Sequence, residues 1–295
     1  PLGLAPGFYP GSFHLGSTTY TTSGFLEVGN GPVPTPLISA GGIVLASLLP
    51  NVSTISPLSI ISIFGQNISG ETILFPELDG NGKLATTLGG LCVEIGGQRG
   101  PIFAVTPTQV NAQTPAIEAL GPVGVVLIRD CDMPGETRST VEMVTVESAT
   151  PGFFLFPPLA ADGIIAARFN DGNAPVAPTG LFPDDSFGPS RPAQPGEIII
   201  LYGSGWGSTE PSFATGELAT GAARVGPNAN VMVTFGGIPV APEDIFYVGV
   251  TPFTAGLFQL AIRVPAGAQA GNNEVVLTVF GKSTPVGPVV PVVVP

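Results

Sequence analysis

The sequence predicts an all-β protein, and three observations support this fold class. Glycine and proline together number 74 of 295 residues (41 Gly + 33 Pro), so helix-breaking residues interrupt nearly every stretch long enough for an α-helix. Short apolar runs, often alternating with polar residues, lie between these breakers, as expected of strands joined by tight turns. Hydrophobic residues make up 44% of the chain, enough for a large core. At ordinary domain size, the length predicts two domains.

The first segment, residues 1–37, is predicted to be an extended arm. Its centre, "STTYTTSGFLEV" (Ser17–Val28), is rich in threonine and aromatic residues and favours a strand. A strand of this kind must add to the edge of a sheet to stay ordered. The candidate donor-strand residues are Tyr20, Phe25, Leu26 and Val28. The sequence leaves open whether the arm pairs within its own chain or inserts into a neighbouring molecule, which would propagate into a filament.

The remainder of the chain contains an internal repeat of four motifs in the same order. The aligned pairs are "PLSIISIFGQNIS" with "PGEIIILYGSGWG", "LCVEIGG" with "VMVTFGG", "QVNAQTP" with "QLAIRVP", and "GPVGVVLI" with "AGNNEVVLTVF". Each pair alternates apolar and polar residues or forms an apolar run that ends at a turn signal. The repeat therefore predicts two domains of one architecture, at residues 38–147 and 195–295.

The uncharged stretch "TPTQVNAQTP" (Thr106–Pro115) is a candidate either for a sugar-binding groove or for a scaffold strand. The repeat favours the scaffold, because one face of this strand stays apolar while its polar residues differ between copies. Residues Val110, Ala112 and Thr114 of the first copy correspond to Leu260, Ile262 and Val264 of the second.

Several of these motifs carry a resemblance to a known family. The segments "SIISIFGQNIS", "TTLGGLCVEIGGQRGPIFAVTPTQVNAQTP", "ATPGFFLF", "RPAQPGEIIILYGSGWG" and "FQLAIRVPAGAQAG" resemble the Solibacter-type uncharacterised C-terminal domain family of secreted bacterial proteins. Each half separately resembles an immunoglobulin-like domain of the IPT/TIG type. The resemblance covers Ile38–Val294 and implies two tandem immunoglobulin-like β-sandwiches on an exported protein, with no established activity.

Residues 148–194 lie between the two copies and are predicted to be a packed connector. Phe153, Phe154 and Phe156 are too apolar for a loose tether, so we expect them to pack against a sandwich edge or between the domains. The alternative is a flexible proline-rich spacer.

The two cysteines, Cys92 and Cys131, each lie in or directly after a strand-like run. They are predicted to form a disulfide if the chain is exported to an oxidising compartment, and two buried thiols are the alternative. The chain begins at Pro1 without methionine. We interpret it as the mature form of an extracellular or cell-surface protein after removal of a signal peptide.

Charge and histidine content exclude several function classes. A formal net charge of −12 disfavours nucleic acid and anionic lipid as partners, and no apolar run approaches the roughly 18 residues of a membrane span. The single histidine, His14, excludes histidine-based triads and multi-histidine metal sites. Acidic clusters lack the EF-hand spacing. No catalytic, cofactor-binding or metal-binding residue is predicted.

The sequence therefore favours a non-enzymatic extracellular structural or surface protein that assembles with itself into a filament by strand addition of the arm. The alternative is an adhesion module for carbohydrate or another surface partner, such as a surface polysaccharide. Its candidate ligand-binding residues are Tyr202, Trp206 and Phe253.

Overall fold

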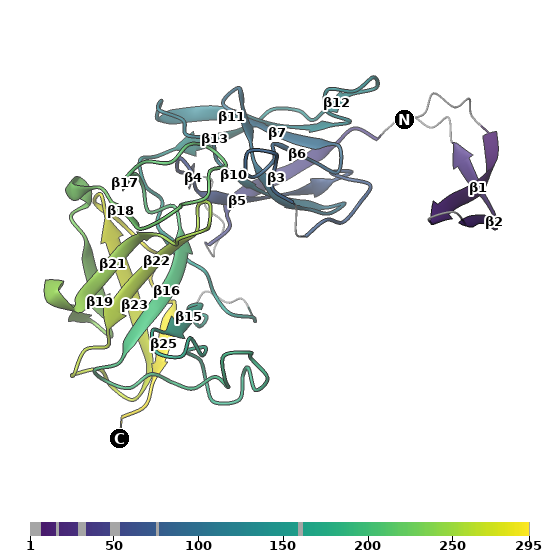
Figure 1. Ribbon diagram of the computed structural model, residues 1–295. Coiled ribbons are helices and arrows are strands. Elements are labelled where there is room, and N and C mark those ends of the chain that lie inside the picture. The colour runs from purple at the N-terminus through teal and green to yellow at the C-terminus, as the bar shows by residue number, and fades with distance from the viewer. Residues whose placement is uncertain are drawn as a thin grey trace. The chain divides into compact units, whose positions relative to one another are not determined.

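The computed structural model describes residues 7–15, 18–28, 34–47, 54–74, 77–158 and 162–294. Within these ranges the chain is all-β, as predicted: it forms strands and two short 3-10 turns, η1 (Pro227–Ala229) and η2 (Pro242–Asp244), and no α-helix. None of the described segments is a helix with the length and hydrophobicity that a bilayer span requires. The chain forms two compact units, Pro1–Pro34 and Thr35–Pro295 (Figure 1).

The first unit is a β-hairpin. Strand β1 (Gly7–Leu15) pairs antiparallel with strand β2 (Thr18–Val28), in a register that runs from Gly7 opposite Val28 to Leu15 opposite Thr18. The predicted arm is thus two strands rather than one, and its second strand pairs within its own chain. The candidate donor-strand residues Tyr20, Phe25, Leu26 and Val28 all lie on β2, and His14 lies on β1.

The first half of the second unit consists of two sheets around one core. One sheet has four strands in the order β3-β5-β10-β9, with bounds Leu37–Leu45, Ile60–Gln66, Gln109–Gln113 and Ile102–Val105. The other has seven strands, with β4-β13-β11-β7-β6 in one path, β12 beside β11 and β8 beside β7. Their bounds in chain order are Thr54–Ile55 (β4), Thr87–Leu88 (β6), Leu91–Ile95 (β7), Gln98–Gly100 (β8), Gly121–Arg129 (β11), Thr137–Arg138 (β12) and Glu142–Val146 (β13). Alternate residues of both sheets face inward and are buried together.

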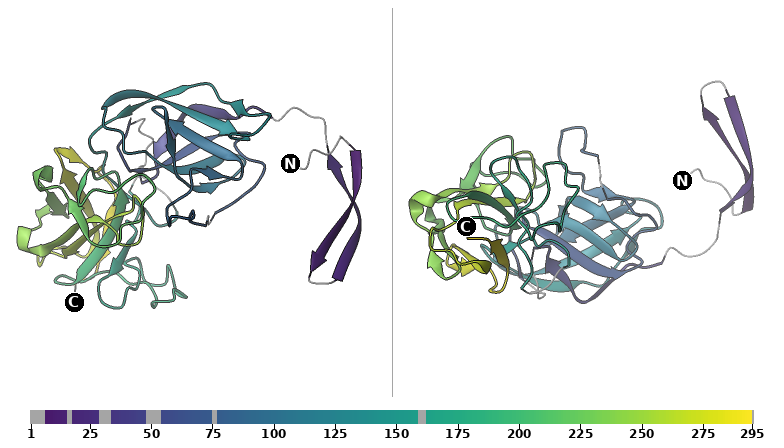
Figure 2. Two further views of the ribbon diagram at one scale, coloured as in Figure 1. Left: turned by 45° about the horizontal axis from the view of Figure 1, so that its top comes forward. Right: turned by 90° about the horizontal axis from the view of Figure 1, so that it is seen from below.

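The second half is built in the same way (Figures 1 and 2). Its larger sheet has the path β14-β16-β22-β21-β18-β17, with β15 beside β16, and its smaller sheet has the path β20-β19-β23-β24, with β25 beside β23. The bounds of the larger sheet are Gly152–Phe153 (β14), Ala167–Phe169 (β15), Ile198–Ser204 (β16), Thr209–Glu210 (β17), Ala223–Val225 (β18), Ile245–Val250 (β21) and Phe258–Arg263 (β22). Those of the smaller sheet are Met232–Phe235 (β19), Ile238–Pro239 (β20), Gly271–Val279 (β23), Lys282–Ser283 (β24) and Val289–Val292 (β25).

The two halves repeat the same strand pairings in the same register. Ile63 of β5 pairs with Val110 of β10, and the aligned residues Leu201 and Leu260 pair between β16 and β22. Val93 of β7 likewise pairs with Leu127 of β11. The aligned residues of the second half, Val233 and Leu277, pair between β19 and β23. All of these side chains are buried. The internal sequence repeat is therefore a structural repeat, and its conserved apolar positions are the inward-facing ones.

The Gly-Gly pairs of the repeat make the hairpin turns after β7 and β19. Gly96 and Gly97 have φ of 58° and 78°, and Gly236 and Gly237 have φ of 57° and 77°. Two consecutive positive φ angles define the turn that matches the twist of adjacent strands, and glycine adopts them without steric cost.

Residues 148–194 are part of the second half rather than a separate layer between the halves. Strands β14 and β15 both pair with β16, and Phe153, Ile165 and Phe169 belong to the core of that half. The Phe156 ring packs on Phe182, with ring centroids 4.7 Å apart. Phe153 and Phe169 therefore lie in the core of the second half, and Phe156 packs on Phe182.

Direct hydrogen bonds join the two halves. The Ser204 hydroxyl accepts from the Ile60 N–H at 2.9 Å and donates to the Gly256 carbonyl at 2.9 Å. The Gln113 amide oxygen accepts from the Gly216 N–H at 2.7 Å. Both side chains are buried, so breaking either contact would leave buried polar groups unpaired. The strand β10 is a scaffold element, as predicted, and one of its polar residues holds the halves together.

Candidate functional site

The three aromatic residues predicted as ligand contacts do not form one surface. Trp206 is fully buried. Its indole N–H donates to the Gly152 carbonyl at 3.2 Å, and its ring packs on Phe153 and Phe258, with centroids 5.8 and 5.6 Å away. The expectation that Trp206 contacts a ligand is therefore wrong. The large apolar ring is more stable in the core than in water, and its one polar atom has a partner there.

Tyr202 lies on β16 and is half-buried, and burial raises the pKa of its phenol. Phe253, by contrast, is 77% exposed and adopts a φ of 63°, which is uncommon for a bulky side chain. Its backbone N–H donates to the Ala219 carbonyl, and the Thr254 hydroxyl donates to the Thr251 carbonyl at 2.7 Å. The loop is therefore held by hydrogen bonds, and it exposes the Phe253 ring to solvent.

Two carboxylates of the second half, Asp185 and Glu197, form ion pairs with arginines. Arg168 donates to both carboxylate oxygens of Asp185, at 3.1 and 3.0 Å. Arg191 does the same with Glu197, at 3.0 and 2.7 Å. These guanidinium groups hold the pKa of both carboxyl groups below their usual range, and backbone N–H donors add to the effect. A carboxyl group with a lowered pKa stays ionised at neutral pH and is poorly suited to donate a proton.

Cys92 and Cys131 form a disulfide, with Cα atoms 5.8 Å apart. Both are buried beside Ile128 on the outer side of the β7–β11 pair. Asp132 lies next to the two sulfurs. Because both sulfurs are oxidised, neither is available as a thiolate nucleophile or metal ligand.

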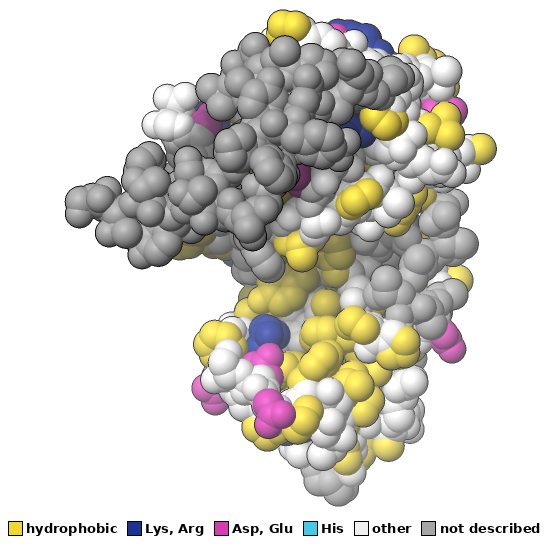
Figure 3. All heavy atoms as spheres, turned by 90° about the vertical axis from the view of Figure 1, so that its right-hand side faces the viewer, with side chains coloured by type: hydrophobic (Ala, Val, Ile, Leu, Met, Phe, Trp, Pro, Cys, Tyr) yellow, Lys and Arg dark blue, Asp and Glu magenta, His cyan; other side chains and the backbone are white. Residues whose placement is uncertain are grey.

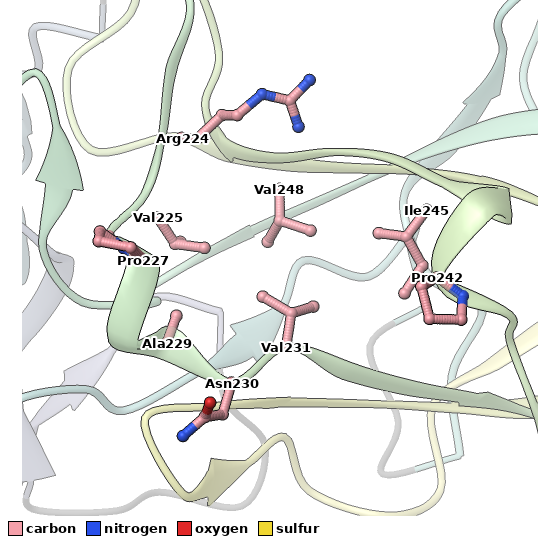
Figure 4. Close-up of a pocket in the computed structure, with 10 residues that line it drawn as sticks. Arg224, Val225, Pro227, Ala229, Asn230, Val231, Pro242, Ile245 and Val248 are labelled. Atoms are coloured by element: carbon pink, nitrogen blue, oxygen red, sulfur yellow. The ribbon is translucent and has the colours of Figure 1, made fainter.

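An apolar groove opens in the second half between its two sheets (Figure 4). The groove has a volume of about 320 Å³. Its lining residues come from β18, η1, the two residues before β19 (Asn230 and Val231), η2 and β21. Val225, Val231, Ile245 and Val248 converge on it, and Val248 belongs to the core of this half while the other three pack against that core. The groove is therefore an opening into the hydrophobic core.

The backbone around this groove explains why it is open. Strand β18 pairs with β21 only at Ala223–Val250 and Arg224–Gly249. After Val225 the chain turns through η1 and crosses to β19 in the other sheet. Among the described strands, none pairs with this edge of β21 before Gly249. That edge therefore lies uncovered by another strand beside an apolar cavity, and of its backbone groups the Phe246 carbonyl accepts from the Arg224 guanidinium.

Arg224 is the only charged residue that lines the groove. Its guanidinium donates to the Phe246 carbonyl at 2.9 Å and lies 5.0 Å from the centre of the Tyr247 ring. Ala223 is buried in the core and Val225 packs against it, so alternation along β18 places Arg224 on the outer face. Within the described parts of the chain, no carboxylate lies within ion-pair distance of Arg224. The sequence predictions missed this residue, and the available signal was a single charged residue in the otherwise uncharged stretch "ATGAARVGPNANVMV".

A second apolar pocket, of about 350 Å³, lies where the two halves meet. Leu58, Ile117 and Leu120 contribute from the first half, and Gly207 and Phe213 contribute from the second. On the face shown in Figure 3, hydrophobic side chains also gather over the second half, with few charged groups among them. The unit thus exposes apolar surface at several places.

No family model matches the chain, and no match is found among curated proteins. The solved structures that it resembles include the extracellular region of plexin A4, with 12% identity over 93% of this chain and a TM-score of 0.29. They also include the Bacteroides ovatus protein SGBP-B in complex with a mixed-linkage heptasaccharide (12% identity, 94% of this chain, TM-score 0.34). A third is an auxiliary nutrient binding protein from the same organism (11% identity, 87% of this chain and 71% of that one, TM-score 0.26).

The chain spans 17% of the plexin structure and 50% of SGBP-B. Identities and TM-scores at this level do not carry a function from one protein to another. The all-β fold rests on the chain's own strand pairing.

Proposed function

We propose that this chain is a non-enzymatic structural protein of the extracellular space that assembles with itself by strand addition of its N-terminal hairpin. One observation carries the proposal: within the described residues, β1 and β2 form a two-stranded sheet whose strands pair only with each other. An isolated two-stranded hairpin is marginally stable in water, and its free edges are templates for a further strand. Addition to a neighbouring molecule would stabilise the hairpin and join the molecules head to tail.

Two further features support this proposal. The chain has only 10% charged residues, and exposed large apolar side chains such as Leu120, Met232 and Val286 are more than half accessible. Apolar surface of this kind favours association with other molecules. The Cys92–Cys131 disulfide suits an oxidising compartment outside the cytosol, as does the resemblance to secreted proteins.

Removal of residues 1–34 is expected to abolish self-assembly and leave a folded monomer, because Thr35–Pro295 forms a compact unit of its own. Sedimentation velocity and negative-stain microscopy over a range of concentrations would measure this, with circular dichroism as the check on folding. A full-length chain that stays monomeric at high concentration would contradict the proposal. Filaments that persist after truncation would show that other surfaces join the molecules.

A second candidate function is adhesion to carbohydrate or another surface partner, and the exposed Phe253 favours it. An aromatic ring held at a positive φ on an exposed loop is a strained feature of the kind found at recognition sites. Replacing Phe253 with alanine is then expected to weaken binding to a responsive surface polysaccharide at least about tenfold, within the range for a binding hot spot. Glycan-array binding followed by calorimetry would measure this, and Leu120→Ala is the control at another exposed apolar site. Equal binding by wild type and Phe253→Ala would remove this candidate.

A further inference from the structure

The groove of the second half is the most specific feature among the exposed apolar surfaces. It joins an opening into the core, a strand edge that β18 does not cover and one guanidinium, that of Arg224, which has no carboxylate partner among the described residues. We infer that this groove is the acceptor for strand β2 of a second copy of the chain. The inference rests on the proposed function and names the surface on which strand addition takes place.

The exposed edge and the donor sequence match in length and pattern. The edge of β21 from Ile245 to Val248 is not covered by β18, and its register with β22 is shifted between Ile245 and Tyr247. The end of β2 reads "GFLEV" (Gly24–Val28). A strand added there would continue the line of β18 along β21, and its alternate residues would face opposite sides of the sheet. If Leu26 and Val28 face inward, they fill the groove and cover the core.

The charges match in the same arrangement. With Leu26 and Val28 inward, Glu27 faces outward, which is the side on which Arg224 lies. Glu27 is the only acidic residue in residues 1–34, and Arg224 is the only charged residue of the groove. An ion pair between them would fix the register of the added strand, because a shift by one residue would turn Glu27 toward the core.

The length of the connecting segment favours a second copy over the same chain. Leu37, the first residue of β3, lies ten positions after Glu27, and a segment of this length spans at most about 35 Å when fully extended. Strand β3 begins at the end of the second unit that is remote from β18 and β21, as two views show (Figures 1 and 2). A compact unit of this length is roughly 45 Å across. The groove of a neighbouring molecule has no such restriction.

A charge-exchange experiment tests the pairing. Arg224→Glu and Glu27→Arg are each expected to raise the concentration needed for assembly at least about tenfold, because like charges then meet in the contact. The double variant is expected to return to within about threefold of wild type, since it restores the opposite charges. Arg129→Glu is the matched control, because Arg129 also lacks an ion-pair partner among the described residues but lies in the first half. It should assemble as wild type does.

Cysteine cross-linking identifies the occupant directly. A chain carrying Glu27→Cys is mixed with a chain carrying Arg224→Cys, and mild oxidation is expected to yield a disulfide-linked heterodimer. A Phe253→Cys chain, whose substituted position is also exposed, should not cross-link. Cross-linking only within a chain that carries both substitutions would overturn the second copy as occupant.

The outcomes separate this inference from the proposed function. If truncation of residues 1–34 abolishes assembly while Arg224→Glu assembles normally and no cross-link forms, strand addition stands and the acceptor lies elsewhere. If the full-length chain never assembles and the mixed chains do not cross-link, both the proposed self-assembly and the groove as its acceptor are contradicted.

Discussion

Replacing Trp206 with alanine is expected to lower the free energy of unfolding by about 3–5 kcal/mol. The indole is fully buried and packs between Phe153 and Phe258, so its removal leaves a cavity lined by rigid aromatic rings. The Gly152 carbonyl would also lose its hydrogen-bond donor, which adds the cost of an unsatisfied buried acceptor. Denaturant unfolding followed by circular dichroism measures the change, because this substitution removes the only tryptophan of the chain.

The matched control is Phe253→Ala, which also removes an aromatic ring close to the second sandwich. Phe253 is 77% exposed, so its loss is expected to change the free energy of unfolding by less than about 0.5 kcal/mol. A loss below about 1 kcal/mol for Trp206→Ala, outside the range for large core truncations, would show that the indole is not a core residue.

Loss of the Cys92–Cys131 disulfide is expected to lower the free energy of unfolding by about 4 kcal/mol, from the chain-entropy model for this loop. The two cysteines are 39 residues apart in the sequence, so the bond removes a large closed loop from the unfolded ensemble. The effect is expected in the first half, where both residues lie on the β7–β11 side of the sandwich.

Comparing oxidised and reduced wild type in denaturant tests this expectation, and the Cys92→Ala/Cys131→Ala variant gives the same comparison without reductant. Circular dichroism follows both halves, while Trp206 fluorescence follows the second half. Coincident transitions would indicate that Ser204 and Gln113 couple the halves into one cooperative unit. Equal stability of the oxidised and reduced forms would contradict a stabilising disulfide.

The strands that the repeat aligns were predictable because their signal is local. Val93, Ile95, Val110 and Ala112 alternate with polar or exposed residues, and a strand with one face in the core has to show that period. The Gly-Gly turn at Gly96 needs two positive φ angles, which restricts the sequence directly. The all-β class and the repeat followed from such signals, whereas the disulfide was predicted on the condition that the chain is exported.

The burial of Trp206 could not be predicted from its neighbours in the sequence. The segment "GSGWGS" has the composition of an exposed loop, and Trp206 was among the candidate ligand-binding residues. The structure instead turns this loop so that the ring enters the core beside Phe153, a residue more than fifty positions away in the chain. Burial of a side chain depends on which distant segment covers it, and a window of neighbouring residues does not contain that information.

The sequence by itself determined the all-β class, the internal repeat, the alternation of its strands and the presence of a single histidine. Those properties depend on backbone preferences and on the residues present. Only the tertiary structure decided that Gln113 and Ser204 join the halves, that residues 148–194 complete the second half, and that β21 is left with an open edge beside Arg224. These features arise where segments far apart in sequence meet, because packing and hydrogen bonding between them are settled when the whole chain has folded.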